Sequence, residues 1–479
     1  MKSSPNFLKA ILATLALVLS FSCSNDDNGD SVPLPTEQNI VEIALGTPEL
    51  SALVSALQAA DGDLVNVLQG DGPFTVLAPT NAAFVTFLAA NGFNSLDDVP
   101  TDVLAEILLN HVISADITSG DLAASGAGYA STNATGAGDN NISIYFNTSN
   151  GVRFNNVSAV TDGGADIDAS NGTIHIVDAV IPIPSIVSHA AANADFSSLV
   201  VALGLADGNL IDVLSGDGPF TVLAPDNAAF ETFLDGTPIG NVNTAALSQI
   251  LLNHVIGDAV SSTDLVAGVA GYTNTSATGP GDNALSLYYN TSDGVQFNGI
   301  STVTTADVVG SNGIIHAVGT VIDIPTVVTF AAADPNFSTL VDALTTLTPG
   351  TDFVNILSRT EGSNADGINP EFTVFAPTND AFDALEEIPG EVVLTQVLLH
   401  HVVSENNITS SDLNPAGDTP ATTLEGDDII ITLPGTDPNI ADVTDGAGNT
   451  GKGIIAVDVQ AGNGVIHVLD SVLLPDTTN

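Results

Sequence analysis

The apolar and polar positions along this chain form a pattern that occurs three times. A short β-prone run at residues 74–77 ends in Ala-Pro, and a helical pattern follows with apolar positions at Phe84, Phe87 and Leu88. A proline cannot donate to a strand ladder, and the Thr or Asp that follows it suits a helix cap. We therefore predict a strand, a proline corner and a capped helix in each copy. The corner residues are Pro79, Thr80 and Asn81; Pro225, Asp226 and Asn227; and Pro377, Thr378 and Asn379.

The spacing of this pattern indicates three whole domains. The corner prolines stand at positions 79, 225 and 377, so the repeat is roughly 150 residues long and far exceeds the ~20–50 residues of a solenoid repeat. We divide the chain into module 1 (39–184), module 2 (185–326) and module 3 (327–475), after a leader (1–22) and an acidic tether (23–38). A proline soon after the last strand marks each boundary, so the linkers are short and the modules have limited freedom.

Each module is predicted to open with an amphipathic helix and to close with hairpins. A polar cap precedes an apolar stripe in every copy, at Thr47, Asn193 and Asp334. One hairpin joins 141–146 to 152–154, and its counterpart joins 285–289 to 295–297. Asn-Gly between β-prone runs is a strong signal of a tight hairpin turn. It occurs at Asn171-Gly172, Asn312-Gly313 and Asn463-Gly464.

Two histidines recur at matching positions in each module. One follows a run of aliphatic residues, and the other lies in the strand after the Asn-Gly turn. A histidine among aliphatic neighbours is typical of a buried, hydrogen-bonded side chain. The alternative is a ligand-facing role, or a pair of histidines that meet at a catalytic cleft. The first set is His111, His254 and His401, and the second is His175, His316 and His467.

The amino terminus has the pattern of a cleaved and lipidated leader. Lys2 and Lys9 precede an apolar run at residues 10–19, which is shorter than a membrane span of about 20 residues. Cys23 follows a small residue, as in a bacterial lipoprotein signal, so the resemblance implies lipid attachment at Cys23. The acidic stretch behind it resembles a surface-export signal. We predict a lipid-anchored, surface-exposed location at the outer membrane, with membrane contact only through the lipid.

The charge balance excludes one class of partner. The chain has 5 Lys and Arg against 56 Asp and Glu, for a formal net charge of −51. Such a chain repels phosphate backbones, which argues against nucleic-acid binding. The acidity favours solubility in a salty medium or attraction of divalent cations and cationic partners. A single cysteine excludes disulfides within the chain.

The common signatures of enzyme chemistry are missing or fail on context. The sequence has no His-Glu-x-x-His and no Gly-x-Ser-x-Gly. Residues 446–453 match G-x-G-x-x-G, but no Ser or Thr follows Lys452 and a strand pattern follows where a helix is required. Asp-Gly clusters such as 61–63 lack EF-hand spacing and suit turns. The chain has no Trp and only 5 Tyr, so it has few aromatic side chains on which a sugar ring could stack.

The three ordered blocks together resemble the fasciclin-type domain. They are T-V-x-A-P-[TD]-N-x-A-F, L-L-x-H-V and N-G-x-I-H, and the resemblance covers about residues 39–475. The resemblance implies an α+β fold, with a β-sandwich or wedge and packed helices in each module. It also implies adhesion without enzymatic chemistry or a cofactor. Family members implicated in integrin binding carry Tyr before the middle histidine, whereas this chain has Asn110, Asn253 and His400. Arg-Gly-Asp is also missing, so integrin binding is not carried over.

These observations predict a non-enzymatic surface lipoprotein that acts in adhesion or matrix binding. Its expected partners are extracellular matrix, a polysaccharide or a cell-surface protein. One alternative is an outer-membrane protein that binds carbohydrate or another nutrient. A second alternative is a hydrolase that uses the recurrent histidine pairs. The binding surface is expected on loops that vary among the modules, because the recurrent corner has the features of a structural joint.

Overall fold

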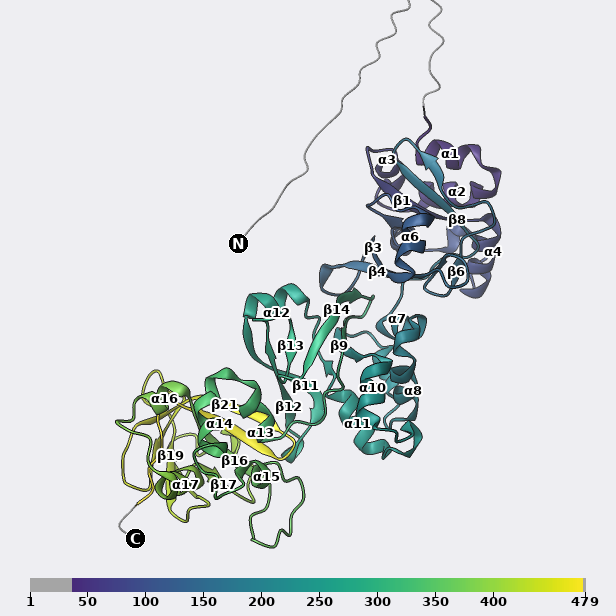
Figure 1. Ribbon diagram of the computed structural model, residues 1–479. Helices are drawn as coiled ribbons and strands as arrows, with labels where there is room; N and C mark the ends of the chain where they lie inside the picture. Colours follow the sequence, from purple (N-terminus) through teal and green to yellow (C-terminus); the bar gives the residue numbers. More distant parts are fainter. Residues whose placement is uncertain (1–36, 477–479) are drawn as a thin grey trace, which may run out of the picture. The chain divides into compact units, whose positions relative to one another are not determined.

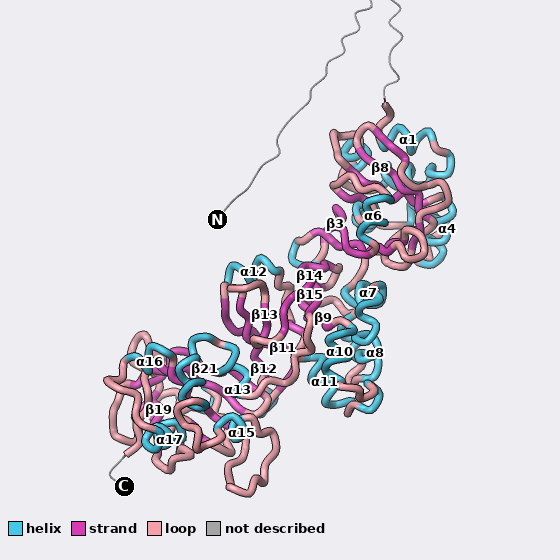
Figure 2. Tube along the Cα trace, in the orientation of Figure 1, coloured by secondary structure: helices cyan, strands magenta, loops and turns pink. Residues whose placement is uncertain are grey.

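The computed structural model describes residues 37–476. The predicted leader, Cys23 and nearly all of the tether lie outside the described residues. Within the described part, each module combines one sheet with a set of helices (Figures 1 and 2). The fold class is therefore α+β, as predicted.

The three modules share the same general order of elements, although module 3 has a 3-10 turn in place of the helix that follows the short second strand in modules 1 and 2. Module 1 contains α1 (Ile40–Gly46), α2 (Ser51–Ala59), α3 (Leu64–Leu68), β1 (Phe74–Pro79), α4 (Asn81–Ala90), α5 (Thr101–Leu109), β2 (Val112–Ile113), α6 (Ser119–Ser125), β3 (Ala127–Thr135), β4 (Asn141–Asn147), β5 (Arg153–Phe154), β6 (Ser158–Ala159), β7 (Ile167–Ala169) and β8 (Gly172–Val177). Module 2 contains α7 (Ile186–Ala192), α8 (Ser197–Leu205), α9 (Leu210–Leu214), β9 (Phe220–Pro225), α10 (Asn227–Leu234), α11 (Thr244–Leu252), β10 (Val255–Ile256), α12 (Ser262–Gly268), β11 (Ala270–Thr278), β12 (Ala284–Asn290), β13 (Gln296–Phe297), β14 (Ser301–Val309) and β15 (Gly313–Val318). Module 3 contains α13 (Val327–Ala333), α14 (Ser338–Thr345), α15 (Phe353–Leu357), β16 (Phe372–Pro377), α16 (Asn379–Asp383), α17 (Glu391–Leu399), β17 (Val402–Val403), β18 (Asp418–Thr422), β19 (Asp428–Thr432), β20 (Ala441–Thr444), β21 (Lys452–Ala461) and β22 (Gly464–Leu469).

The sheet of each module is built around one parallel pair. In module 1 the strand order is β6-β5-β4-β3-β2-β1-β8-β7, and β1 pairs in parallel with β8. Phe74 lies opposite Gly172, and Pro79 lies opposite Val177. The pairs β9 with β15 and β16 with β22 have the same register. The strand before the proline corner is thus paired with the last strand of its own module.

Two apolar cores lie on opposite sides of this central pair in module 1. Val76 and Ala78 face a core built with α1 to α5, whereas Leu77 faces a smaller core that includes Leu122 of α6 and Phe154 of β5. Successive side chains of a strand point to opposite faces, so a strand between two cores needs apolar residues on both faces. This accounts for the apolar run from Val76 to Ala78 before the corner. The one polar side chain of β1, Thr75, is buried and donates to the Ala115 carbonyl at 2.6 Å.

The predicted corner is confirmed in all three modules. The Thr80 hydroxyl accepts a hydrogen bond from the Ala83 backbone N–H at 3.2 Å and caps α4. Asp226 caps α10 in the same way, and Thr378 caps α16. The cap satisfies a backbone N–H in the first turn of the helix that would otherwise need water. The chain can therefore turn from the sheet into the helix while the corner stays packed against the core.

Each module opens with a helix that was not predicted, and one of the three predicted caps is wrong. Helices α1, α7 and α13 precede the predicted amphipathic helix, which itself begins with a 3-10 turn. Thr47 was predicted as a cap, and this is wrong: its hydroxyl donates to the Ile43 carbonyl at 2.8 Å and makes no cap hydrogen bond. Asn193 and Asp334 do cap their 3-10 turns. The extra helices are only 7 residues long, too short for a clear periodic signal.

The predicted hairpins are confirmed, and the Asn-Gly hairpin has an additional constraint. β4 pairs with β5, β12 pairs with β13, and the Asn-Gly turns join antiparallel strands. A Cβ at Gly172 would lie 1.9 Å from the carbonyl oxygen of Phe74 on β1. Gly313 and Gly464 face Phe220 and Phe372 in the same way, so the neighbouring parallel strand leaves no room for a side chain.

Among residues 37–476, no single helix has the length and apolarity to cross a membrane. Two sharply bent helix pairs reach the length and apolarity of a membrane span only when their two helices are taken together. They are Ile40–Gly46 with Pro48–Ala59 and Ile186–Ala192 with Ala194–Leu205.

Candidate functional site

The corner asparagines hold two parts of each module together. The side-chain oxygen of Asn81 accepts hydrogen bonds from the Ala52 backbone N–H at 2.8 Å and from the Ser51 hydroxyl, and its amide donates to the Pro48 carbonyl at 3.0 Å. Asn227 and Asn379 make the same three contacts in their modules. The corner is therefore fixed to the start of the preceding helix, and the side chain has a partner for each of its two functional groups.

The first set of histidines joins the end of a helix to the end of the module. The Nδ1 of His111 lies 2.7 Å from the Ile107 carbonyl, and its Nε2 accepts from the Ile181 backbone N–H at 2.9 Å. His254 and His401 have equivalent partners. Burial lowers the pKa of each of these three histidines from 6.5 to about 4, so the neutral form is present at pH 7.

The second set of histidines is also buried, and two of its three members use both ring nitrogens. His175 Nε2 donates to the Ile117 carbonyl at 2.9 Å, and its Nδ1 accepts from the Asp166 backbone N–H at 3.2 Å. His316 has the matching pair of contacts. His467 keeps the Nε2 contact, to Ile408 at 2.8 Å, while its Nδ1 has no hydrogen-bond partner among the described residues.

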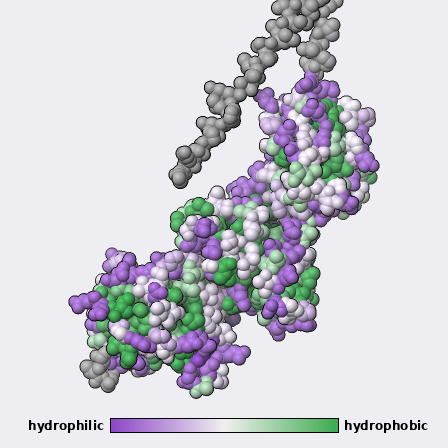
Figure 3. Space-filling model, in the orientation of Figure 1, coloured by the Kyte–Doolittle hydropathy of each residue, from purple (hydrophilic) through white to green (hydrophobic). Residues whose placement is uncertain are grey.

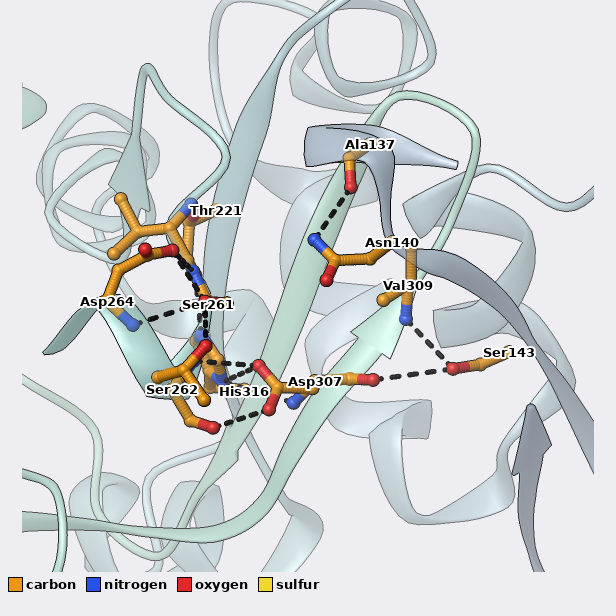
Figure 4. A network of polar contacts seen from close by, with 12 residues as sticks. Ala137, Asn140, Ser143, Thr221, Ser261, Ser262, Asp264, Asp307, Val309 and His316 are labelled. Carbon is orange, nitrogen blue, oxygen red and sulfur yellow. Dashed lines mark hydrogen bonds and ion pairs between the residues drawn. The ribbon is translucent and has the colours of Figure 1, made fainter. Parts of the chain in front are cut away.

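A serine, an aspartate and a histidine lie together in every module, and Figure 4 shows the group in module 2. The Ser262 hydroxyl donates to the Asp307 carboxylate, and the Asp307 backbone N–H donates to His316. Nucleophilic catalysis requires a hydrogen bond from the serine to the histidine, with the aspartate behind the histidine. Here the serine is bound to the aspartate, and both ring nitrogens face backbone groups, so the arrangement holds α12 to β14 and lacks the geometry of a triad.

The main prediction of buried, hydrogen-bonded histidines is confirmed, and the alternative of a histidine pair at an open cleft is not seen for His111 and His175. His111 and His175 are both buried, at 1% and 0% exposure, and each uses both ring nitrogens on backbone groups. A general acid or base needs a ring nitrogen within reach of a substrate proton. The hydrolase alternative therefore loses the observation that motivated it.

The asparagine of the Asn-Gly turn has a larger role than the sequence indicated. The Asn171 side chain accepts from the Ile40 backbone N–H at 3.0 Å and donates to the Leu68 and Gly70 carbonyls, each at 2.8 Å. Asn312 and Asn463 make the same three bonds. One buried side chain thus ties the closing hairpin to α1 and to the end of α3. The turn signal identified this residue but gave no indication of its partners.

Module 3 contains the one group of described residues with the composition of a metal site. His400, Glu425 and Asp427 offer ligand atoms within 4.8 Å of one another. However, the Nε2 of His400 accepts from the Gly446 backbone N–H at 3.0 Å, which places the ring proton on Nδ1, 3.5 Å from Glu425. A metal needs a free lone pair on the ring. The group is therefore better explained as a hydrogen-bond network in which His400 replaces Asn110 and Asn253.

Successive modules are joined by side chains at matching positions. The Ser143 hydroxyl of module 1 accepts from the Val309 backbone N–H at 3.0 Å and donates to the Asp307 carbonyl at 3.4 Å in module 2 (Figure 4). Ser286 of module 2 accepts from the Gln460 backbone N–H of module 3 at 3.0 Å. Ser143 and Ser286 lie at matching strand positions, and each contacts the module that follows its own.

The fold and these contacts define a class of protein made of tandem α+β modules, whose recurrent polar side chains hold the fold together. The fasciclin domain model matches residues 48–184, 194–325 and 335–475, so the chain belongs to the fasciclin domain family. Fasciclin domains are typical of cell-adhesion and matrix-binding proteins.

Relatives of different lengths match the chain. The transforming growth factor-beta-induced protein ig-h3 of Oryctolagus cuniculus is 28% identical over 451 residues, which cover 91% of this chain and 57% of that protein. Protein sll1483 of Synechocystis is 39% identical over 150 residues, which cover 30% of this chain and 73% of that protein. The solved domain pair of the insect cell adhesion molecule fasciclin I has a TM-score of 0.38 and 19% identity, and covers 59% of this chain and 97% of that one. The chain thus spans little more than half of the ig-h3 protein.

Proposed function

We propose that this chain is a non-enzymatic adhesion or matrix-binding protein, held at the outer membrane surface by a lipid on Cys23. The observation that carries the proposal is that the recurrent polar side chains use their hydrogen-bonding groups within the fold. The corner asparagines and both histidine sets bind backbone groups of their own modules. Some exposed positions differ among the modules, such as the one held by Val85, Glu231 and Asp383. Such differences suit recognition of an extended partner such as a matrix protein, a polysaccharide or a cell-surface protein.

The surface supports binding through several weak contacts. Polar and apolar residues are intermingled on the visible face of the described residues (Figure 3). The exposed apolar side chains of the chain include Val392 at 80% and Val85 at 68%. Three linked modules raise the effective concentration of each site for a repeating partner, so avidity exceeds the affinity of one module. The acidic composition favours a cationic partner or one bridged by divalent cations.

A panel of matrix proteins and polysaccharides tests the proposal. The full chain is passed over each immobilised ligand at low and at high ligand density, with and without Ca²⁺. We expect dissociation at least about tenfold slower at high density, because several modules then engage together. An equally acidic unrelated protein is the control, and binding no better than this control contradicts the proposal. Binding to polysaccharide alone, with free sugars as competitors, favours the carbohydrate-binding alternative.

The lipid anchor gives a separate prediction. Cys23→Ala removes the only thiol available for acylation, and hydrocarbon burial contributes about 0.8 kcal/mol for each methylene. We expect the variant to move from the membrane fraction to the soluble fraction, with Ser22→Ala as the control that leaves the cysteine in place. Cell fractionation followed by immunoblotting measures the result. Membrane association that persists in Cys23→Ala contradicts the anchor.

A further inference from the structure

Module 3 contains an apolar cavity of about 270 Å³ between its first helices and its sheet. Ala331 of α13, Val341 and Leu344 of α14, Phe353 of α15 and Ile466 of β22 are among the residues that line it. An engineered cavity of about 150 Å³ with similar lining stays free of water and binds benzene. The cavity of module 3 is larger than this one. If it were empty, its lining would lose packing interactions, and the free energy of unfolding of the domain would be lower by a large share of its total.

The lining offers no polar group to a ligand. His401 and Thr345 are the only lining residues with polar side chains. The nitrogens of His401 are occupied by the Val397 carbonyl and the Leu473 backbone N–H. The Thr345 hydroxyl donates to the Val341 carbonyl at 2.7 Å. Water needs two or more polar partners in a cavity, so the space suits an apolar molecule better than water.

The charge near the cavity disfavours an acidic ligand. Residues 327–358, which form the three helices of this region, contain no Lys or Arg but include Asp342 and Asp352. Arg359, which follows this stretch, is paired with Asp366 at 2.9 Å. The carboxylate of a fatty acid would therefore find no unpaired cation on this stretch and would meet a surface of like charge. At the rim, Ala332, Thr345 and Val354 line the cavity and are solvent-exposed, which provides an entrance.

The chain differs from module to module where α14 leads into α15. Seven residues (346–352) connect α14 to α15, whereas four residues (60–63 and 206–209) connect the corresponding helices in modules 1 and 2. Ala331 of module 3 is only partly buried, while its counterparts Ala44 and Ala190 are buried at 4% and 6% exposure. The longer connection thus coincides with looser packing around α13.

We propose that module 3 binds an uncharged apolar small molecule in this cavity. By comparison with the benzene cavity, its volume suits a hydrocarbon ring system or chain of about ten carbon atoms. Binding follows from apolar burial alone, because every polar side chain of the lining already has a partner. This site is independent of the surface contacts proposed for adhesion.

Titration of the full chain with naphthalene, followed by its fluorescence, tests the site. We expect one saturable site per chain. Ala331→Leu fills the cavity, so we expect at least tenfold weaker binding and a higher melting temperature for module 3. The matched control is Ala190→Leu in module 2, which we expect to bind naphthalene normally and to melt earlier, because the position is already packed. Ala332→Phe, at an exposed rim position, is a second variant that is expected to fold and to weaken binding.

A second pair of probes separates apolar burial from recognition of a head group. We expect 1-octanol to compete with naphthalene, and octanoate to compete at least tenfold less well. Lack of saturable naphthalene binding, or equal binding by the wild type, Ala331→Leu and Ala332→Phe, overturns the site. Equal competition by octanoate overturns the selectivity for an uncharged ligand.

Discussion

Replacement of Asn171 by alanine is expected to destabilise module 1 by about 3–5 kcal/mol, since each buried group left without a partner costs about 1–3 kcal/mol. The variant removes the partners of one backbone N–H, on Ile40, and of two carbonyls, on Leu68 and Gly70. Asn171 is only 8% exposed, so water replaces these partners poorly. Urea unfolding followed by hydrogen-exchange mass spectrometry measures the free energy of unfolding for each module.

Two controls define this experiment. Asn94→Ala changes an exposed asparagine of the same module and is expected to shift stability by less than about 0.5 kcal/mol. Asn312→Ala changes the matching position in module 2, so we expect module 2 to show the largest loss of free energy of unfolding in that variant. A loss of under about 1 kcal/mol for Asn171→Ala would mean that the three bonds contribute only what a single average hydrogen bond does.

Acidification from pH 6.5 to about 4 is expected to destabilise the modules through their buried histidines. The folded-state pKa of His111 is about 4, below its ordinary value of 6.5, because burial disfavours the charged ring. The unfolded chain therefore binds more protons in this window, and the stability present above pH 6.5 is lost as the pH falls. A shift of this size corresponds to about 3 kcal/mol.

The variant His111→Gln isolates this contribution. Glutamine does not titrate, so module 1 is expected to be less stable at pH 7 and to lose less stability between pH 6.5 and 4. His254 keeps module 2 sensitive to pH in the same molecule and serves as the internal control. Hydrogen exchange at a series of pH values measures both modules. The prediction is wrong if module 1 shows the same pH slope in the wild type and the variant.

Local chemistry made much of the fold predictable. The proline corner, the caps at Thr80 and Asp226 and the Asn-Gly hairpins depend on residues within a few positions of one another, and all of them occur in the structure. The predictions failed where local signals were weak or ambiguous. Helix α1 is too short for a clear period, and Thr47 lies at a helix boundary where its hydroxyl has a competing acceptor at Ile43.

The sequence by itself determined the three-fold repeat, the fasciclin resemblance and the order of strand, corner and helix, because these follow from residue types at fixed short spacings. Only the tertiary structure decided what the recurrent side chains do. Asn171 meets the backbone of Ile40 across 131 residues, and His111 meets that of Ile181 across 70 residues. No short pattern encodes such distant partners. Whether a histidine is available for chemistry depends on them, because a ring nitrogen that binds a buried backbone group is not free to bind a substrate.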